Sequence, residues 1–168
     1  MKKKNLVILY TTVLFLLSVT VFSQENVSPY KISGGIRMGF TSGLSAKYFL
    51  NDKIALEGIA GIRYFHGSGF TGLVEAHYPN VFDVENLYAY IGGGAHAGFF
   101  FWYNTNGYWK KNAPNAPFFV GVDIIGGLEY KLPEYPLTLS FDLKPQLDVF
   151  GFYPDIAGGG LTLRYILK

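Results

Sequence analysis

The chain has 168 residues, of which 49% are hydrophobic, 18% are aromatic and only 15% are charged. This length predicts one domain, and the composition is too apolar for a disordered protein. The chain has no cysteine, which excludes a disulfide scaffold, a thiolate metal site, a cysteine nucleophile and a lipid anchor on an N-terminal cysteine. Its 21 glycines and many aromatic residues favour short strands joined by turns.

The first 23 residues have the pattern of a secretory signal peptide. Residues 1–4 are basic after the initial methionine, residues 6–22 are mostly apolar, and the small residue Ser23 precedes a polar break. This pattern predicts cleavage after Ser23, which leaves residues 24–168 as the mature domain. The alternative is a retained anchor, because an apolar run of about 17 residues is near the lower limit for a spanning helix.

Removal of this segment changes the net charge. The whole chain has 14 basic and 12 acidic residues, for a formal net charge of +2. Lys2, Lys3 and Lys4 leave with the signal peptide, so the remaining basic residues are outnumbered by one and the net charge is about −1. The mature domain therefore gives no argument for nucleic acid as a partner.

After a polar leader, the chain is predicted to form about eight strands. In each run, apolar side chains alternate with small or polar ones, as expected where successive side chains point to opposite faces of a strand. The most apolar later stretch is interrupted by glycines and by His96, so it is not a transmembrane helix. In chain order, the predicted strands span residues 31–39, 44–50, 56–64, 70–78, 87–103, 118–130, 137–149 and 161–167.

The run 137–149, LTLSFDLKPQLDV, shows the alternation most clearly. It is longer than the usual strand of about five or six residues and long enough to cross a bilayer at a tilt, which needs roughly 9–11 residues. Pro145 within it cannot donate to a strand ladder. We therefore predict a β-bulge at Pro145, with the alternation faltering within a residue or two of it.

The ionisable residues inside these runs share the less apolar parity of their strands. The opposite parity mixes large aliphatic residues with glycine and alanine, a surface to which lipid tails conform but which would leave voids in a close-packed core. Aromatic residues gather near the strand ends, as in the girdles of membrane barrels. The pattern favours a closed, antiparallel, up-and-down transmembrane β-barrel over a secreted sandwich or lipocalin-like barrel. The predicted inward charges and histidines are Arg37, Lys47, Glu57, Arg63, Glu75, His77, His96, Asp123, Glu129, Asp142, Lys144, Asp148 and Arg164.

This inward set contains five firm cations and six anions. An eight-strand barrel has an interior just wide enough for side chains, and an unpaired buried charge is very costly. We therefore expect the charges to pair with one another and to plug the lumen. In particular, the charged residues of 137–149 are expected to pair with Arg37, Arg63 or Arg164 across it.

Four stretches, YKISGGIRMGF, YAYIGGGAHAGFF, LSFDLKPQL and GLTLRYILK, carry a family resemblance. They resemble the small OmpA/OmpX-type barrels, in particular the outer membrane protein beta-barrel domain family of Gram-negative bacteria, over about residues 30–168. The resemblance implies a monomer in the outer membrane, in contact with its lipid and lipopolysaccharide and inserted by the barrel-assembly machinery. The last strand of that family usually ends on an aromatic residue, whereas here Tyr165 is followed by three further residues.

The sequence predicts no catalytic residue, metal site or cofactor. His96-Ala97-Gly98 lies where lipid A deacylases, which are similar small barrels, have a His-x-Ser pair, but it lacks the serine nucleophile. The three histidines lie in different segments without metal-ligand spacing. We expect a structural or surface-interaction protein and not an enzyme. The alternatives are a narrow porin-like channel, a lipid-modifying barrel enzyme and a secreted lipid-binding barrel.

The segment 99–112, FFFWYNTNGYWKKN, is a candidate surface hairpin with its tip at Asn106-Gly107. Its aromatic residues could bind an extracellular glycan or protein by stacking, and its two lysines could contact lipopolysaccharide phosphates. We favour the simpler interpretation, an aromatic girdle with a polar tip. The residues concerned are Trp102, Tyr103, Tyr108, Trp109, Lys110 and Lys111.

With the N-terminus in the periplasm, the predicted connections divide between the two sides of the membrane. The turns at 51–53, 79–86 and 133–136 would face the periplasm. The connections 40–43, 65–69, 101–117 and 150–158 would face the outside.

Overall fold

The computed structural model describes residues 29–63, 67–101, 117–150 and 158–168. These residues form strands and one short 3₁₀ turn, η1 (Val81–Asp83), so the all-β class is confirmed. The strands are β1 (Ile32–Gly39), β2 (Thr41–Phe49), β3 (Ile54–Arg63), β4 (Gly67–Tyr78), β5 (Leu87–Phe100), β6 (Phe118–Lys131), β7 (Leu137–Leu143), β8 (Gln146–Phe150) and β9 (Gly159–Ile166).

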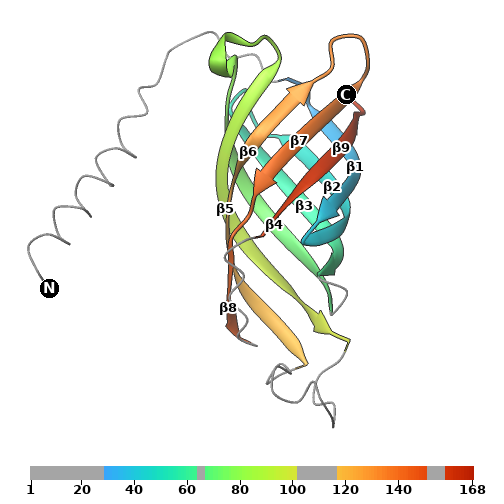
Figure 1. Ribbon diagram of the computed structural model, residues 1–168, viewed down its shortest axis with the longest axis vertical. Coiled ribbons are helices and arrows are strands. Elements are labelled where there is room, and N and C mark those ends of the chain that lie inside the picture. The colour runs from blue at the N-terminus through green and yellow to red at the C-terminus, as the bar shows by residue number, and fades with distance from the viewer. Residues whose placement is uncertain (1–28, 64–66, 102–116, 151–157) are drawn as a thin grey trace, which may run out of the picture.

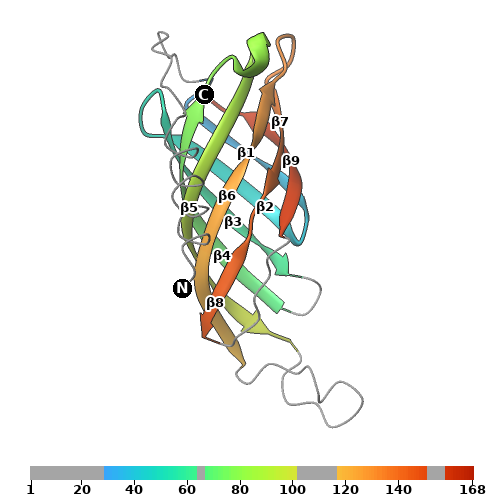
Figure 2. The same cartoon turned by 60° about the vertical axis from the view of Figure 1, so that its left-hand side comes forward.

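The strands close into one antiparallel up-and-down barrel (Figures 1 and 2). Each strand from β1 to β6 pairs with the next one along the chain, β6 then pairs with both β7 and β8, and β9 joins β7 to β1. Because β7 and β8 are two parts of one interrupted strand, the wall has eight strands, as the sequence predicted.

The interruption between β7 and β8 falls at Pro145, but the pairing register does not change there. Leu143 lies opposite Gly126 before the proline, and Gln146 lies opposite Asp123 after it, in the same register. The carbonyl of Pro145 still accepts a hydrogen bond of 3.0 Å from the backbone N–H of Ile124 on the neighbouring strand β6. The missing N–H of proline therefore interrupts the strand without inserting a residue.

The predicted position of the bulge is wrong. The register shifts further along β8, where Gly121 lies opposite Asp148 but Val120 lies opposite Phe150, so that Val149 is the extra residue. Side chains continue to alternate between buried and exposed past Pro145 as far as this bulge. The alternation holds because no residue is inserted at Pro145 and its carbonyl still accepts a hydrogen bond.

The connections separate into two ends. The end with the connections β2–β3, β4–β5 and β6–β7 and with the C-terminus is called the turn end, and it is uppermost in Figure 1. The opposite end is called the loop end.

At the loop end, the turn expected at 40–43 is shorter than predicted, because only Phe40 separates β1 from β2. Gly39 makes this possible with a φ of 148°, which few other residues adopt.

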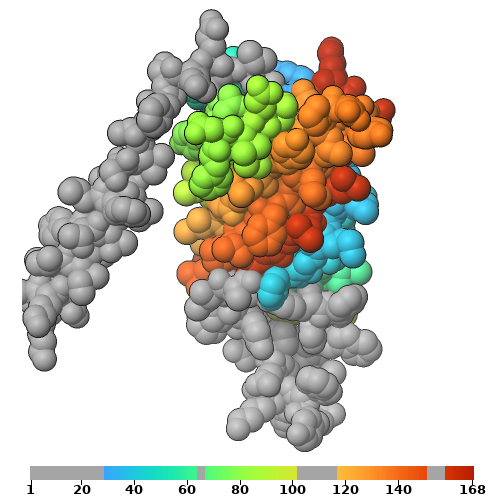
Figure 3. Space-filling model, turned by 45° about the horizontal axis from the view of Figure 1, so that its top comes forward, coloured from blue at the N-terminus to red at the C-terminus, as the bar shows by residue number. Residues whose placement is uncertain are grey.

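The charged residues that the structure describes occupy two places only. They are buried inside the barrel, or they lie on the turn end, where Lys31, Asp52, Lys53, Asp83, Glu85, Lys131, Glu134 and Lys168 are found. The outer wall between the two ends presents aliphatic and aromatic side chains, with Met38 and Val149 among the most exposed. Figure 3 shows this wall as a continuous surface over β7, β9 and β1.

Aromatic residues mark both ends of the wall. On the strands, four exposed tyrosines lie near the turn end and four exposed phenylalanines lie in the half nearer the loop end, while Phe141 lies between them and Phe82 of η1 lies at the turn end. The tyrosines are Tyr48, Tyr78, Tyr130 and Tyr165, and the phenylalanines are Phe70, Phe99, Phe118 and Phe150. Within the described parts of the chain, no helix is long and apolar enough to cross a membrane.

Candidate functional site

The interior of the barrel holds all thirteen ionisable residues that the sequence placed there. Each is buried, and the most exposed of them, Arg63, has an exposed fraction of 6%. Each strand from β1 to β9 contributes at least one of them, and Lys144 lies between β7 and β8. They share the interior because alternate residues of a strand point to the same face. They form three groups along the barrel.

Lys47 is the centre of the first group. Its Nζ lies 2.8 Å from Glu75 Oε2, 3.1 Å from Glu129 Oε2 and 3.5 Å from Glu57 Oε2. These carboxylates come from three different strands, β3, β4 and β6. The ammonium also lies 4.4 Å from the centre of the Tyr90 ring, a cation–π distance. Lys47 therefore ties together four strands of the wall besides its own.

Arg164 of β9 completes this group from the other side of the lumen. Its guanidinium contacts Glu57 through Nη2 and Glu129 through Nη1, the latter at 3.1 Å. Its remaining N–H groups donate to Ser45 Oγ at 2.8 Å and to Ser140 Oγ at 3.0 Å. Ser45 in turn donates to Glu57 at 2.7 Å. Two cations thus share two carboxylates, and two hydroxyls satisfy the donors that are left over.

An aromatic layer covers the first group on the side of the turn end. The hydroxyl of Tyr30, just before β1, donates to Glu129 Oε1 at 2.8 Å, and burial together with that carboxylate raises the pKa of Tyr30 above its ordinary value. The Tyr30 ring meets Phe49 edge to face, at 5.1 Å between centroids. His77 then lies between Phe49 and Tyr90, stacked on the latter at 5.0 Å.

The second group is an ion pair between β1 and β7, the two strands that flank β9. Arg37 Nη1 donates to Asp142 Oδ2 and Nη2 donates to Oδ1, each at 2.6 Å, which is the bidentate geometry of strong charged pairs. Arg37 also donates to Thr162 at 3.2 Å, and the Tyr90 hydroxyl donates to Asp142 at 3.3 Å. Gly160 lies beside the guanidinium, where an added Cβ would come within 3.0 Å of it.

The third group lies nearer the loop end and is built around His96. Its Nδ1 is 2.9 Å from Asp123 Oδ2, and its Nε2 is 2.8 Å from Asp148 Oδ1. An imidazolium satisfies both contacts because both of its nitrogens donate, whereas a neutral ring donates from one only. Asp148 also pairs with Arg63 at 2.8 Å.

Lys144 closes the third group from the gap between β7 and β8. Its Nζ lies 2.8 Å from Asp123 Oδ1 and donates to Gln146 Oε1 at 2.9 Å. A cavity of about 10 Å³ remains beside Arg63 and His96, which is about the space of one water molecule.

The pairing differs in detail from the sequence expectation. Two of the expected pairs form, Arg37 with Asp142 and Arg63 with Asp148. Arg164 instead binds two glutamates of other strands, and Lys144 meets another aspartate. Parity indicates which residues face inward, but the partners depend on the stagger between strands, which one sequence does not reveal.

Several residues of this network were not singled out from the sequence. Ser45, Ser140, Tyr90 and Gln146 lie on the inward parity of their strands, so the same alternation could have indicated them. Tyr30 precedes the first strand and gave no such signal. Its role depends on the end of the chain, because the backbone of Lys31 donates to the carbonyl of Lys168 at 2.6 Å.

Among solved structures, this chain is similar to the N-terminal β-barrel domain of OprF from Pseudomonas aeruginosa. The TM-score is 0.55, and the match covers 80% of this chain and 93% of that domain at 19% sequence identity. The two share the fold of a closed antiparallel β-barrel. No family model and no curated protein matches the sequence.

Two sets of predicted residues lie outside the described parts of the chain. One is the predicted signal peptide, residues 1–23. The other is the candidate surface hairpin, Trp102, Tyr103, Tyr108, Trp109, Lys110 and Lys111.

Proposed function

We propose that this chain is a small integral protein of the outer membrane of a Gram-negative bacterium, with a lumen plugged by paired charges, and that it has a structural or surface-interaction role. One observation carries the proposal: the described charges lie inside the barrel or on the turn end, and the wall between the ends has none. In water this arrangement would be inverted, because soluble proteins bury apolar side chains and expose charges.

The shape of the molecule supports a position across a membrane. A closed barrel satisfies every backbone hydrogen bond within its own wall, as a bilayer requires. The tyrosines near the turn end and the phenylalanines nearer the loop end match the two aromatic girdles of membrane barrels. The longest connection between strands, residues 101–117, leaves the loop end, which supports an orientation with the turn end in the periplasm and the loop end outside.

The ion pairs support a plugged lumen. The charged contacts of the three groups span the interior from Tyr30 near the turn end to Arg63 near the loop end. Opening a path would separate buried charges from their partners, at a cost of several kcal/mol for each pair broken. We therefore favour a structural barrel over a narrow porin-like channel.

The interior also argues against the lipid-modifying enzyme. His96 is buried inside the barrel with both ring nitrogens on aspartates, while Ala97 is the residue that faces outward. A histidine held in this way has no free nitrogen to act as a base on a lipid.

The partners proposed for a barrel in the outer membrane are lipid, lipopolysaccharide, the assembly machinery during insertion and an extracellular glycan or protein at the loop end.

Cell fractionation combined with gel electrophoresis tests the membrane assignment. The protein should pellet with outer membranes, should require detergent for extraction and should change its gel mobility on heating, because a closed barrel resists unfolding in detergent. Recovery in a soluble fraction without detergent, with one mobility before and after heating, would favour the secreted lipid-binding barrel.

A further inference from the structure

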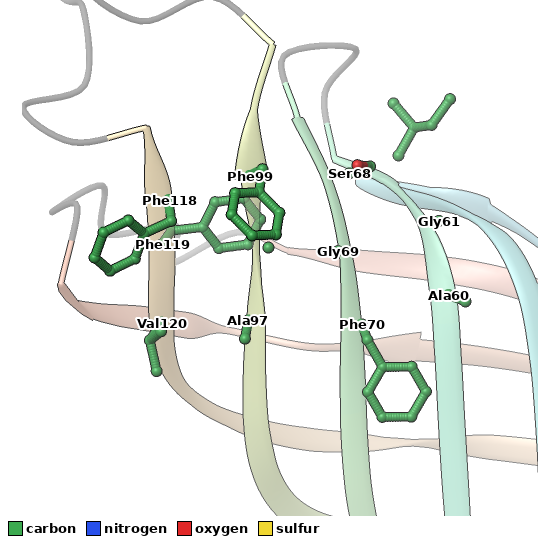
Figure 4. A pocket seen from close by; sticks show the side chains of 12 residues that line it. Ala60, Gly61, Ser68, Gly69, Phe70, Ala97, Phe99, Phe118, Phe119 and Val120 are labelled. Carbon is green, nitrogen blue, oxygen red and sulfur yellow. The ribbon is translucent and has the colours of Figure 1, made fainter.

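The outer wall carries a hollow of about 660 Å³ across β3, β4, β5 and β6 (Figure 4). The hollow is shallow and open on its outer side. The hollow lies toward the loop end, where β5 ends and β6 begins. Its outward-facing border consists of Ala60, Ile62, Ser68, Phe70, Ala97, Phe99, Phe118 and Val120.

Glycines form the floor of the hollow. Gly61, Gly69 and Gly98 lie side by side on three neighbouring strands, paired in register. The ring of Phe119 lies against Gly69 and Gly98 from the inside, because a Cβ added to Gly69 would come within 3.2 Å of its Cζ. The floor is thus bare backbone with a phenyl ring behind it, and it has no charged group.

The orientation of Phe70 leaves the hollow open. Its ring leans over Gly58 and Gly72, where added Cβ atoms would lie 3.4 Å and 3.8 Å from ring carbons. Figure 4 shows the ring pointing away from Ser68 and Phe99. The neighbour of Phe70 on β5 is Ala97, whose methyl group is too small to fill the space. The succession of large and small side chains therefore leaves a hollow in this part of the wall.

We propose that this hollow holds one acyl chain of a lipid A molecule. The inference rests on the proposed function, which orients the loop end to the outer leaflet, where lipid A is the lipid that carries acyl chains. The described lining has no charge, and aromatic rings border it as they border pockets for flexible apolar ligands. The Ser68 hydroxyl lies on the loop side, positioned to donate to a carbonyl at the head of the chain.

An ordinary stretch of barrel wall exchanges its lipids freely, because lipid tails conform to it without preference. A recess with a rigid floor and aromatic sides offers more contact to one chain than the flat wall does. The inference therefore predicts one retained lipid A molecule per barrel, in addition to the lipids that exchange.

Native mass spectrometry of the refolded mature chain tests this inference, with purified lipid A and, separately, phosphatidylethanolamine as probes. Ala97→Phe fills the hollow, and Ala60→Phe fills it from the opposite side if the first variant folds poorly. Ala95→Phe is the matched control, since Ala95 lies on the same strand and face two residues away, outside the lining. Wild type and Ala95→Phe should each retain one lipid A, and the filled variants should retain about tenfold less.

Equal retention of lipid A by all four proteins would overturn the inference, because the contact would then be that of the general wall. Preferred retention of phosphatidylethanolamine, or displacement of lipid A by a protein partner, would also overturn it. Insertion into vesicles and heat-dependent gel mobility are measured on the same samples. Failure of insertion contradicts the proposed function and this inference together, whereas insertion without a retained lipid A contradicts this inference alone.

Discussion

Lys47 shows how single residues hold this barrel together. Its ammonium lies within 3.5 Å of three carboxylates that come from three strands. Because the interior around it is fully buried, these contacts are weakly screened by solvent and salt. At the residue scale, the lumen is a set of mutually dependent pairs, in which each cation offsets the burial cost of several carboxylates.

Replacement of Lys47 by methionine should strongly destabilise the barrel. The side chain keeps its approximate length but loses its charge. Glu57 and Glu129 then share Arg164, and Glu75 keeps only its contact with His77 among the described ion pairs. Breaking a buried pair from one side costs about 3–5 kcal/mol. Urea unfolding in vesicles, followed by heat-dependent gel mobility, measures the loss.

Lys53→Met is the control for this substitution, because Lys53 is exposed in the β2–β3 turn and its variant should unfold like the wild type. If the two methionine variants unfold at the same urea concentration, the lumen pairs do not stabilise the fold as described.

At the element scale, local chemistry sets where strands end. The β2–β3 turn is closed by Asn51, whose Oδ1 accepts from the backbone N–H groups of Lys53 at 2.9 Å and Ile54 at 2.8 Å. Asparagine favours turns through such bonds to the backbone that follows it. The hairpin thereby fixes the pairing of Lys47 with Glu57, two residues whose side chains meet in the lumen.

Asn51→Ala removes both of these bonds and should destabilise the barrel by about 0.5–1.5 kcal/mol, since the turn is exposed and water can replace part of the loss. Its refolding rate into vesicles should also fall. Asp52→Ala in the same turn is the comparison, because its side chain takes no part in these bonds. An equal effect of the two substitutions would show that Asn51 has no special role in the turn.

The strands themselves could be predicted from the sequence, whereas the position of the bulge in one of them could not. A period of two is visible in each run because one face meets an apolar environment and the other a charged one. The place of the bulge depends on how β8 fits against β6 near the loop end, so Val149 carries no sequence signal for it. Pro145 does carry a signal, but the chain accommodates it by losing one hydrogen bond.

At the scale of the whole molecule, sequence parity was sufficient to separate wall from lumen, because a closed barrel has only these two faces. It was not sufficient to pair the lumen charges or to reveal the hollow, because both depend on neighbours across strands. Phe70 leans over Gly58 and Gly72, for example, because of pairing that joins β3, β4 and β5. The position of Tyr30 in the aromatic layer likewise depends on the pairing of the first strand, β1, with the last strand, β9.

A charge placed on the middle of the outer wall should be costly if a membrane surrounds it. Ile124 is an outward residue in the middle of β6, and Ile124→Arg should destabilise the barrel by about 2–4 kcal/mol. Leu167→Arg, at the turn end, should cost about 0–1 kcal/mol, because the side chain there reaches the interface. Unfolding in vesicles of defined lipid measures both. Similar small effects for the two variants would show that no apolar solvent covers the wall.

The central claim is that paired charges close the lumen of a membrane barrel, and single-channel recording of the purified mature chain in planar bilayers tests it most directly. Ion pairs from the Tyr30 contact to the Arg63 contact leave about 10 Å³ of space beside Arg63 and His96, so the wild-type protein should insert without steady openings. Steady, ohmic current through the inserted protein, altered in conductance by Glu75→Ala or Arg63→Ala, would contradict the plug and favour a narrow channel.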